Sequence, residues 1–399
     1  MSFLFEYIDI NPKETIIRGC LAKKIPMDKL QPFCRDIPEY EISEFNGGSK
    51  FRNGDTIMAR ITPCLENGKT AMVNILDSNE VGFGSTEYIV FRAKKNLTTP
   101  DFVYYLICSS FVRDPAIKSM VGSSGRQRVQ TDVIANLDIY FPKLSDQVKI
   151  AGVLKSLDDK IALNNAINNN LEQQAKAIFK SWFVDFEPFG GVQPSEMQFI
   201  PLQELCKVVT KGTTPTTLGK SFTSSGINFI KAESILDNHS IDSSKFAFID
   251  EETNALLKRS IIKANDIVFT IAGTLGRFAM VDNSVLPANT NQAVAIIRPD
   301  ETKVTPAYLY SFFIGNWHNE YYSKRIQQAV QANLSLTTIK SLPIAVLNNT
   351  TMSNYEKLVS PLFALMKNNE EENRRLSKLR DALLPKLMSG ELDVSDIEI

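Results

Sequence analysis

The sequence has few cysteines and histidines, and neither residue type is arranged for metal binding or disulfide formation. Its 399 residues include five cysteines and two histidines. An odd number of cysteines without a Cys-x-x-Cys pair argues against both a disulfide framework and a zinc site. His239 and His318 are far apart and lack a ligand-spaced partner, so we expect structural roles for both. These absences predict no metal site and a reduced, cytoplasmic location.

Long apolar runs and an excess of one charge are also missing. No run of about 18 apolar residues occurs, and acids at Glu6 and Asp9 replace the basic region of a signal peptide. We therefore expect neither secretion nor membrane spanning. The formal net charge is −1, so a nucleic-acid partner would require positive side chains gathered on one face.

Three familiar catalytic patterns are incomplete. Adenine methylation commonly uses an Asn/Asp-Pro-Pro-aromatic loop, but Asn11-Pro12-Lys13-Glu14 lacks the second proline and the ring. A GxxxxGK[S/T] phosphate loop would need glycine at Thr214, five residues before Gly219. The acids within residues 299–303 are adjacent in one predicted turn, so they cannot act as metal ligands from separate strands. We expect no catalytic residue in this chain.

A repeated segment dominates what the sequence does contain. Residues 147–183 have a counterpart in residues 353–388, and the matched residues align without a gap at a constant offset of 205 residues. Apolar and amide residues recur in steps of four and three, which is typical of a helix that pairs with another helix. The predicted seam comprises Leu157, Ile161, Asn164, Asn168, Leu171 and Ile178 in the first copy and Leu362, Met366, Asn369, Asn373, Leu376 and Leu383 in the second. Both copies are nearly free of glycine and proline, so we expect two long helices that pair antiparallel.

Asparagines occupy the middle of this seam. Buried asparagine reduces stability relative to leucine but penalises other alignments, so these residues can set the register of the pair. Alternatively, these turns are solvated and merely tolerate asparagine. The sequence leaves both interpretations open.

A globular region precedes each long helix, and the two regions share a loose plan. The first contains predicted strands at residues 5–10, 55–61, 70–75, 88–92 and 137–141, with helices beginning at Pro100 and Thr131. The second region repeats two features of the first. The Asn-Gly-Asp turn at residues 53–55 corresponds to Ala-Asn-Asp at residues 264–266, and the helix start Thr99-Pro100 corresponds to Thr305-Pro306. We expect an α+β fold with a pseudo-twofold internal repeat. Its predicted parts are globular domains at 1–145 and 197–350, helices at 146–187 and 351–390, a linker at 188–196 and a tail at 391–399.

Three segments give the chain a specific resemblance to a known family. They are Met58–Thr70, Ile178–Phe189 and Leu379–Glu391. Together with the duplication, they make the chain similar to the specificity (S) subunits of type I restriction-modification systems over nearly its whole length. The second domain opens with the family-like LQELCKVVTKGTTP, whereas the first begins directly at MSFLFEYIDINP. We therefore expect two domain subtypes and unequal half-sites.

The resemblance implies a host-defence function in DNA recognition. Each globular domain would be a target recognition domain that reads one half of an asymmetric, bipartite double-stranded DNA sequence. The helix pair would space the domains and dock two methyltransferase subunits, which motor-nuclease subunits then join. This chain would hold no cofactor: S-adenosylmethionine would belong to the methyltransferase subunits, and ATP and Mg to the motor-nuclease subunits. A rival of another class is a non-catalytic protein-interaction scaffold that carries duplicated binding domains on a coiled-coil rod.

Candidate DNA contacts are basic and amide residues in glycine-containing loops, where backbone donors approach phosphates and long side chains reach bases. The segment 122–128, GSSGRQR, is the strongest candidate because its two arginines can serve phosphate and guanine together; the alternative is a solubilising loop. The first-domain candidates are Arg60, Asn67, Lys69, Ser124, Arg126, Gln127 and Arg128. The second-domain candidates are Lys211, Thr213, Thr214, Lys231, Thr274, Arg277, Asn291, Gln292, Gln327, Gln328 and Gln331.

The length of the seam suggests a spacing for the two half-sites. From Leu157 to Trp182 it spans 26 residues, or about 39 Å at 1.5 Å per residue. One turn of B-DNA is about 34 to 36 Å. We therefore expect half-sites about one helical turn apart on the same side of the duplex.

Overall fold

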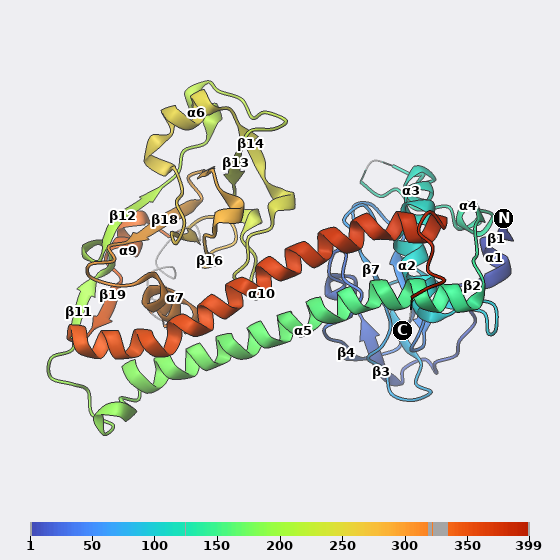
Figure 1. Cartoon of the computed structure of the whole chain (residues 1–399), viewed down its shortest axis with the longest axis horizontal. Coiled ribbons are helices and arrows are strands. Elements are labelled where there is room, and N and C mark those ends of the chain that lie inside the picture. Colours follow the sequence, from blue (N-terminus) through green and yellow to red (C-terminus); the bar gives the residue numbers. More distant parts are fainter. Residues whose placement is uncertain (1, 124, 318–320, 322–333, 398–399) are drawn as a thin grey trace. The chain divides into compact units, whose positions relative to one another are not determined.

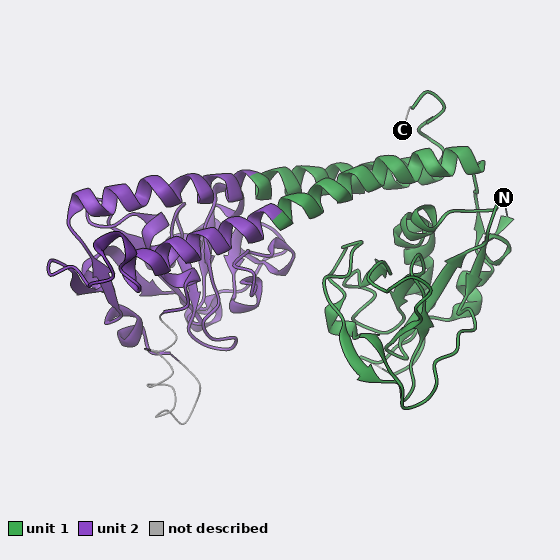
Figure 2. Ribbon diagram, turned by 90° about the horizontal axis from the view of Figure 1, so that it is seen from below, with its two compact units in different colours: residues 1–166, 369–399 green, residues 167–368 purple. Residues whose placement is uncertain are grey.

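A computed structural model of the chain describes residues 2–123, 125–317, 321 and 334–397. The chain forms two compact units, of which unit 1 comprises Met1–Ala166 with Asn369–Ile399, and unit 2 comprises Ile167–Asn368 (Figure 2). The long helices α5 (Leu144–Phe183) and α10 (Asn349–Ser389) are labelled in Figure 1, and each contributes residues to both units (Figure 2). Each unit thus contains one globular domain and part of each long helix.

An antiparallel sheet of four strands lies at the centre of the globular domain in unit 1. Its strand order is β2 (Ile8–Ile10), β9 (Tyr88–Ala93), β6 (Thr56–Ala59) and β7 (Thr70–Met72). A second sheet has the order β4 (Glu41–Glu44), β3 (Leu21–Ile25), β8 (Gly82–Gly84) and β5 (Lys50–Phe51). Strand β1 (Ser2–Phe3) pairs with β10 (Asp138–Ile139).

The central sheet of unit 1 is covered on both faces, because alternate residues of a strand point to opposite sides. Met58 and Phe91 pack in one cluster with residues of α2, whereas Ile57 and Val90 pack in another with residues of the second sheet. All four residues of β6 are therefore buried. The helices of this domain are α1 (Leu4–Tyr7), η1 (Met27–Lys29), α2 (Pro100–Cys108), α3 (Ser110–Lys118) and α4 (Thr131–Ala135).

One predicted strand of the first domain is partly wrong. Residues 4–7 form the single turn α1, and only Ile8–Ile10 is a strand. The turn buries Leu4 completely and leaves Phe5 45% exposed. One buried residue beside exposed neighbours gives the same alternating pattern as a half-buried strand, so the sequence did not distinguish the two. The predicted helix from Pro100 ends at Cys108, and α3 begins at Ser110.

The globular domain of unit 2 repeats the same central sheet. Its strand order is β12 (Cys206–Lys211), β18 (Val294–Pro299), β15 (Ile267–Thr270) and β16 (Phe278–Met280). A second sheet contains β14 (Ala247–Ile249), β13 (Ile227–Ile230) and β17 (Ala288–Thr290), and β11 (Gln198–Pro201) pairs with β19 (Pro343–Val346). Its α-helices are α6 (Glu251–Leu256), α7 (Pro306–Ile314) and α9 (Leu336–Lys340). Its 3-10 turns are η2 (Glu187–Phe189), η3 (Leu202–Glu204), η4 (Pro215–Leu218), η5 (Ala232–Ser234), η6 (Ser243–Lys245), η7 (Lys258–Ser260) and η8 (Asn283–Val285).

The two domains also share details of a turn and a helix cap. Gly54 and Asn265 both have positive φ, at 88° and 67°. Each is followed by an aspartate that accepts a backbone N–H three residues earlier at 2.7 Å. The Thr99 and Thr305 side chains cap α2 and α7 in the same way. The predicted α+β fold with an internal repeat is confirmed, while the exact residue ranges given for the domains stay a prediction.

The long helices pair antiparallel in each unit, as predicted. In unit 1, Asn164 of α5 donates to Asn373 of α10 at 2.9 Å. In unit 2, Asn168 donates to the carbonyl oxygen of Met366 at 3.1 Å. Later residues of α5 thus meet earlier residues of α10. All twelve predicted seam residues are buried or half-buried. Within the described residues, no helix is long and apolar enough to cross a membrane.

Candidate nucleic-acid interface

The structure joins two predicted contact segments of the first domain that are about 60 residues apart in the sequence. Val129 donates its N–H to the carbonyl of Arg60 at 2.9 Å, and Thr62 donates to the carbonyl of Gln127 at 3.0 Å. Arg128 and Val121 exchange both backbone hydrogen bonds, so the two ends of this segment, residues 121–128, are paired with each other. Arg60 and the arginines of this loop therefore belong to one surface, which we call the first-domain loop cluster. Ser124 lies outside the described residues.

A carboxylate that the sequence did not indicate lies inside this cluster. Glu87 accepts hydrogen bonds from Nε and Nη2 of Arg128 at 2.6 to 3.0 Å, and Nε of Arg60 is 3.6 Å away. The hydrogen bond from Arg128 lowers the pKa of Glu87, and the same bond raises the pKa of Arg128. The available signal was strand register: β6 pairs with β9, and Arg60 continues that ladder by donating its N–H to the carbonyl of Glu87 at 2.9 Å.

The turn between β6 and β7 holds the other two first-domain candidates. Asn67 is exposed, whereas Lys69 is half-buried and donates from Nζ to the carbonyl of Met27 at 2.8 Å. The Lys69 ammonium thus has a partner inside its own domain. Contact of either residue with DNA stays a prediction.

A second loop cluster, in unit 2, combines residues 211–214 with residues 291–292. Gly212 donates its N–H to the carbonyl of Asn291 at 3.1 Å, and the Thr214 hydroxyl donates to the side-chain oxygen of Gln292. A Cβ on Gly212 would lie 1.9 Å from the carbonyl oxygen of Thr290, so only glycine permits this approach. We call these residues the second-domain loop cluster.

Sequence reasoning missed one arginine of the second-domain loop cluster. Arg259, which is exposed, donates from Nη2 to the Thr213 hydroxyl at 3.3 Å and lies 3.5 Å from the carbonyl oxygen of Lys211. It follows α6 in the short turn η7. No glycine-containing loop surrounds it in the sequence, so only the tertiary contacts place it here.

The remaining second-domain candidates have partners within their own domain or lie outside the described residues. Lys231 pairs with Glu233 at 3.0 Å, and Arg277 pairs with Asp237 at 2.6 Å. The carbonyl oxygen of Thr274 accepts the hydroxyl of Thr270. Gln327, Gln328 and Gln331 are not among the described residues.

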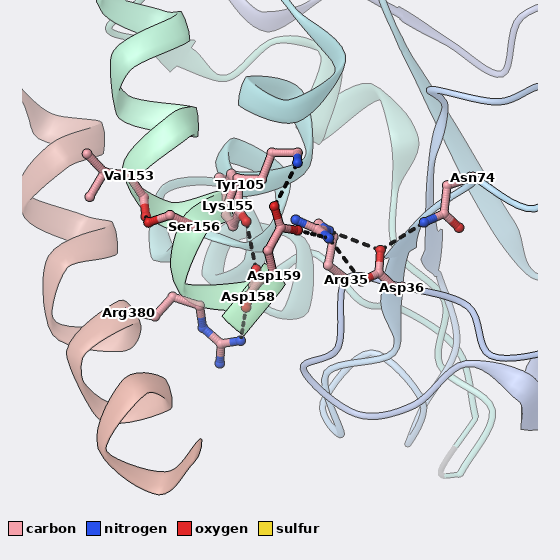
Figure 3. A network of polar contacts seen from close by, with 10 residues as sticks. All are labelled: Arg35, Asp36, Asn74, Tyr105, Val153, Lys155, Ser156, Asp158, Asp159 and Arg380. Atoms are coloured by element: carbon pink, nitrogen blue, oxygen red, sulfur yellow. Dashed lines mark hydrogen bonds and ion pairs between the residues drawn. The ribbon is translucent and has the colours of Figure 1, made fainter. Parts of the chain in front are cut away.

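A buried polar network attaches the first domain to the long helices within unit 1 (Figure 3). Asp158 of α5 accepts the Tyr105 hydroxyl at 2.7 Å and Nη1 of Arg380 at 2.8 Å. Arg35 bridges Asp36 and Asp159 at 3.0 and 2.6 Å. Burial is the largest single influence and lowers the pKa of Arg380, but the attraction of Asp158 and Asp381 and the hydrogen bonds to both together outweigh it, so the pKa rises.

The corresponding positions of unit 2 carry no charged side chain. At the offset of the repeat, Tyr310 corresponds to Tyr105, Phe363 to Asp158, and Ala175 to Arg380. The rings of Tyr310 and Phe363 meet edge to face with centroids 5.2 Å apart, and Ala175 is fully buried. Equivalent domain–helix junctions therefore use ionic contacts in one unit and aromatic contacts in the other.

The described residues contain no group of three or more His, Cys, Asp or Glu side chains that could hold a metal ion. His239 instead stacks on Phe278, with ring centroids 4.1 Å apart. His318 lies outside the described residues.

Comparison with known proteins identifies the family. Residues 28–173 and 194–375 match the family model of the type I restriction modification DNA specificity domain. The chain belongs to this type I specificity family. Each match covers most of one globular domain together with part of the long helix that follows it. The predicted resemblance is thus confirmed.

Individual members of the type I specificity family show the same relation along most of the chain. The type I restriction enzyme HindI specificity subunit of Haemophilus influenzae is 26% identical, over 86% of this chain and 87% of that protein. The MjaIX specificity subunit of Methanocaldococcus jannaschii is also 26% identical, over 76% of this chain and 71% of that protein. The crystal structure of a type I S subunit from M. genitalium has a similar fold, with a TM-score of 0.55 at 14% identity over 97% of this chain and 95% of that one.

Proposed function

We propose that the chain gives a type I restriction-modification complex its sequence specificity, with each globular domain reading one half of an asymmetric bipartite DNA target. The observation that carries this proposal is one repeated framework with two different loop clusters. The central sheets have equivalent strand order. The first-domain loop cluster is richer in arginine, whereas the second combines the single arginine Arg259 with lysine, threonine and glutamine. Such a pair would read unlike half-sites, because arginine favours guanine and amides favour adenine.

The two long helices would hold the domains at a set spacing and dock two methyltransferase subunits. Motor-nuclease subunits would then join this core. In this arrangement the chain itself catalyses nothing, S-adenosylmethionine acts in the methyltransferase subunits, and ATP and Mg act in the motor-nuclease subunits. The paired asparagines of the seam support the spacing role, because a polar contact within a helix pair penalises shifted registers.

A methylome comparison tests the proposal. Host DNA is sequenced for N6-methyladenine in the parent strain and in a strain that lacks this gene, with expression of the methyltransferase subunit confirmed in both. We expect an asymmetric two-part motif to disappear on deletion and to return with a plasmid copy. An unchanged methylome would contradict the proposal, and so would failure of the chain to co-purify with the methyltransferase subunit.

A further inference from the structure

Two arginines of the first-domain loop cluster differ in their contacts with the rest of the protein. Arg126 and Arg128 are two residues apart on the same loop, and both are exposed. Arg128 is bound to Glu87 through Nε and Nη2. Arg126 has no ion pair with any residue that the structure describes. The structure thus separates two side chains that the sequence pattern treats alike.

Glu87 occupies only one edge of the Arg128 guanidinium. Arginine carries five N–H donors in a planar fork. The carboxylate takes the edge formed by Nε and Nη2, and Nη1 has no hydrogen-bond partner among the described residues. The outer edge, formed by Nη1 and Nη2, therefore keeps two donors side by side. Two parallel N–H donors are what arginine uses to bind guanine O6 and N7.

Both ends of the Arg128 side chain are fixed by the protein. Its backbone exchanges two hydrogen bonds with Val121 at 2.9 and 3.0 Å, and the next residue bonds to Arg60. The carbonyl of Glu87 also bonds to Arg60, so the carboxylate and the arginine are anchored to the same end of β6. Arg128 therefore loses little further freedom when it binds a partner, which favours a precise contact over an adaptable one.

Arg277 in unit 2 provides a useful contrast. Asp237 also holds it through Nε and Nη2, at 2.6 Å each, but Nη1 of Arg277 donates to the carbonyl of Ile235 at 3.4 Å. Its outer edge is thus partly occupied by its own domain. This geometry suits an arginine that orders the 235–237 loop, whereas Arg128 combines a fixed plane with an open edge.

From these contacts we infer that Glu87 is a positioning residue that holds Arg128 for reading a guanine in one half-site, while Arg126 contacts the phosphate backbone. The inference rests on the proposed function and assigns separate roles within it. A phosphate contact needs only a positive charge, whereas lysine cannot keep the fixed, planar pair of donors that the held Arg128 would present to guanine. Replacement of each arginine by lysine therefore distinguishes the two roles.

The test uses the full chain co-expressed with its methyltransferase subunit, with the host methylome as readout. We expect Arg128→Lys and Glu87→Gln to extend methylation to sites that differ at one position of one half-site, with discrimination there reduced about tenfold or more. The other half-site stays unchanged and serves as the folding control. Arg126→Lys, the matched control, keeps the original motif. Arg126→Ala also keeps it but lowers the slope of log affinity against log salt by about one, measured on a duplex that carries the motif.

Two results would overturn the inference while leaving the proposed function intact. One is an unchanged motif and unchanged discrimination in Arg128→Lys, which would make Arg128 another phosphate contact. The other is relaxation at a single base pair in Arg126→Lys. If the Glu87→Gln variant does not fold, the Arg128→Lys variant still tests the inference, because lysine retains the positive charge that pairs with Glu87. No methylation by the wild-type complex would instead overturn the proposed function itself.

Discussion

At the scale of single residues, the arginines of the loop regions differ in whether they form an ion pair with a carboxylate. Arg128 and Arg277 each bind a carboxylate, whereas Arg126 and Arg259 have no ion pair within the described residues. This grouping matters because a bound carboxylate offsets the positive field of a guanidinium, which keeps its own charge, and fixes its direction. A basic residue in a sequence motif therefore does not indicate by itself whether it serves affinity or selectivity.

Gly212 is the residue on which the second-domain loop cluster depends. We expect Gly212→Ala to push β12 away from residues 290–291, because the new Cβ would overlap the carbonyl oxygen of Thr290. The variant should lose recognition of one half-site while retaining the other, as measured by the methylome. Thr216→Ala, at an exposed position of the next turn, is the control and should change neither half-site. An unaltered motif in Gly212→Ala would show that the strand end can shift without consequence.

Protonation of Glu14 makes the stability of unit 1 depend on pH in the acid range. Burial tends to raise the pKa of Glu14, but hydrogen bonds from Arg52 and Arg92 outweigh it and lower the pKa below the usual 4.5. The folded state thus binds this proton less readily than the unfolded state. Glu14 therefore stabilises the fold above pH 4.5, and this contribution is lost as the pH falls through its lowered pKa.

Urea unfolding of the wild type and Glu14→Gln between pH 7 and pH 3 measures this effect. We expect the variant to be less stable at neutral pH and the difference between the two proteins to shrink in acid. A constant difference across the range would mean that the ion pairs with Arg52 and Arg92 contribute nothing to folding.

At the scale of elements, the attachment of each domain to the helices is specific to its unit. The first domain relies on Asp158 and Arg380, whose side chains are only 6% and 13% exposed. The second relies on aromatic packing around Phe179 and Tyr355. A domain moved from one junction to the other would place a charge against an apolar surface, which is costly. The two junctions are therefore not interchangeable without changes in the helices.

Loss of Arg380 should destabilise unit 1. Arg380→Ala leaves the buried Asp158 carboxylate with the Tyr105 hydroxyl but without a charged partner, and removal of one member of a buried pair costs about 3 kcal/mol. Arg375→Ala, five residues earlier on the same helix, removes an 82% exposed arginine and should cost about 0.5 kcal/mol or less. Chemical denaturation of both variants checks this difference. Equal losses in the two variants would indicate helix propensity rather than the ion pair.

At the scale of the whole molecule, the proposed spacing role of the helix pair can be tested by shortening both helices together. Asn164 contacts Asn373 and Asn168 contacts Met366, so residues 163–169 lie about opposite residues 367–373. Deletion of both seven-residue segments (heptads) removes two turns from each helix and shortens the pair by about 10 Å. We expect the spacer of the methylated motif to shorten by about three base pairs, at 3.4 Å per base pair.

Deletion of only one of these heptads is the control, because it misaligns the pair and should abolish methylation. An unchanged spacer after the double deletion would contradict the proposed spacing role while leaving recognition of each half-site unaffected.

The sequence alone was sufficient for the repeat, the helix pair and the family. Steps of three and four residues and the constant offset are local or periodic signals, and they survive without knowledge of tertiary contacts. The Thr-Pro helix starts at Thr99 and Thr305 were readable for the same reason. The turn at residues 4–7 was not, because one buried leucine beside exposed neighbours fits two kinds of local structure equally well.

Tertiary structure alone decided which candidates share a surface and how each is held. Glu87 and Arg259 carry no motif. Glu87 joins its loop cluster because β6 pairs with β9, and Arg259 joins the other because its side chain in η7 reaches Thr213. The same holds for the network around Asp158, which draws on four separate segments. The role of a charged side chain depends on the groups that it contacts. When folding brings those groups together from distant segments, the sequence contains no periodic pattern that would predict the contact.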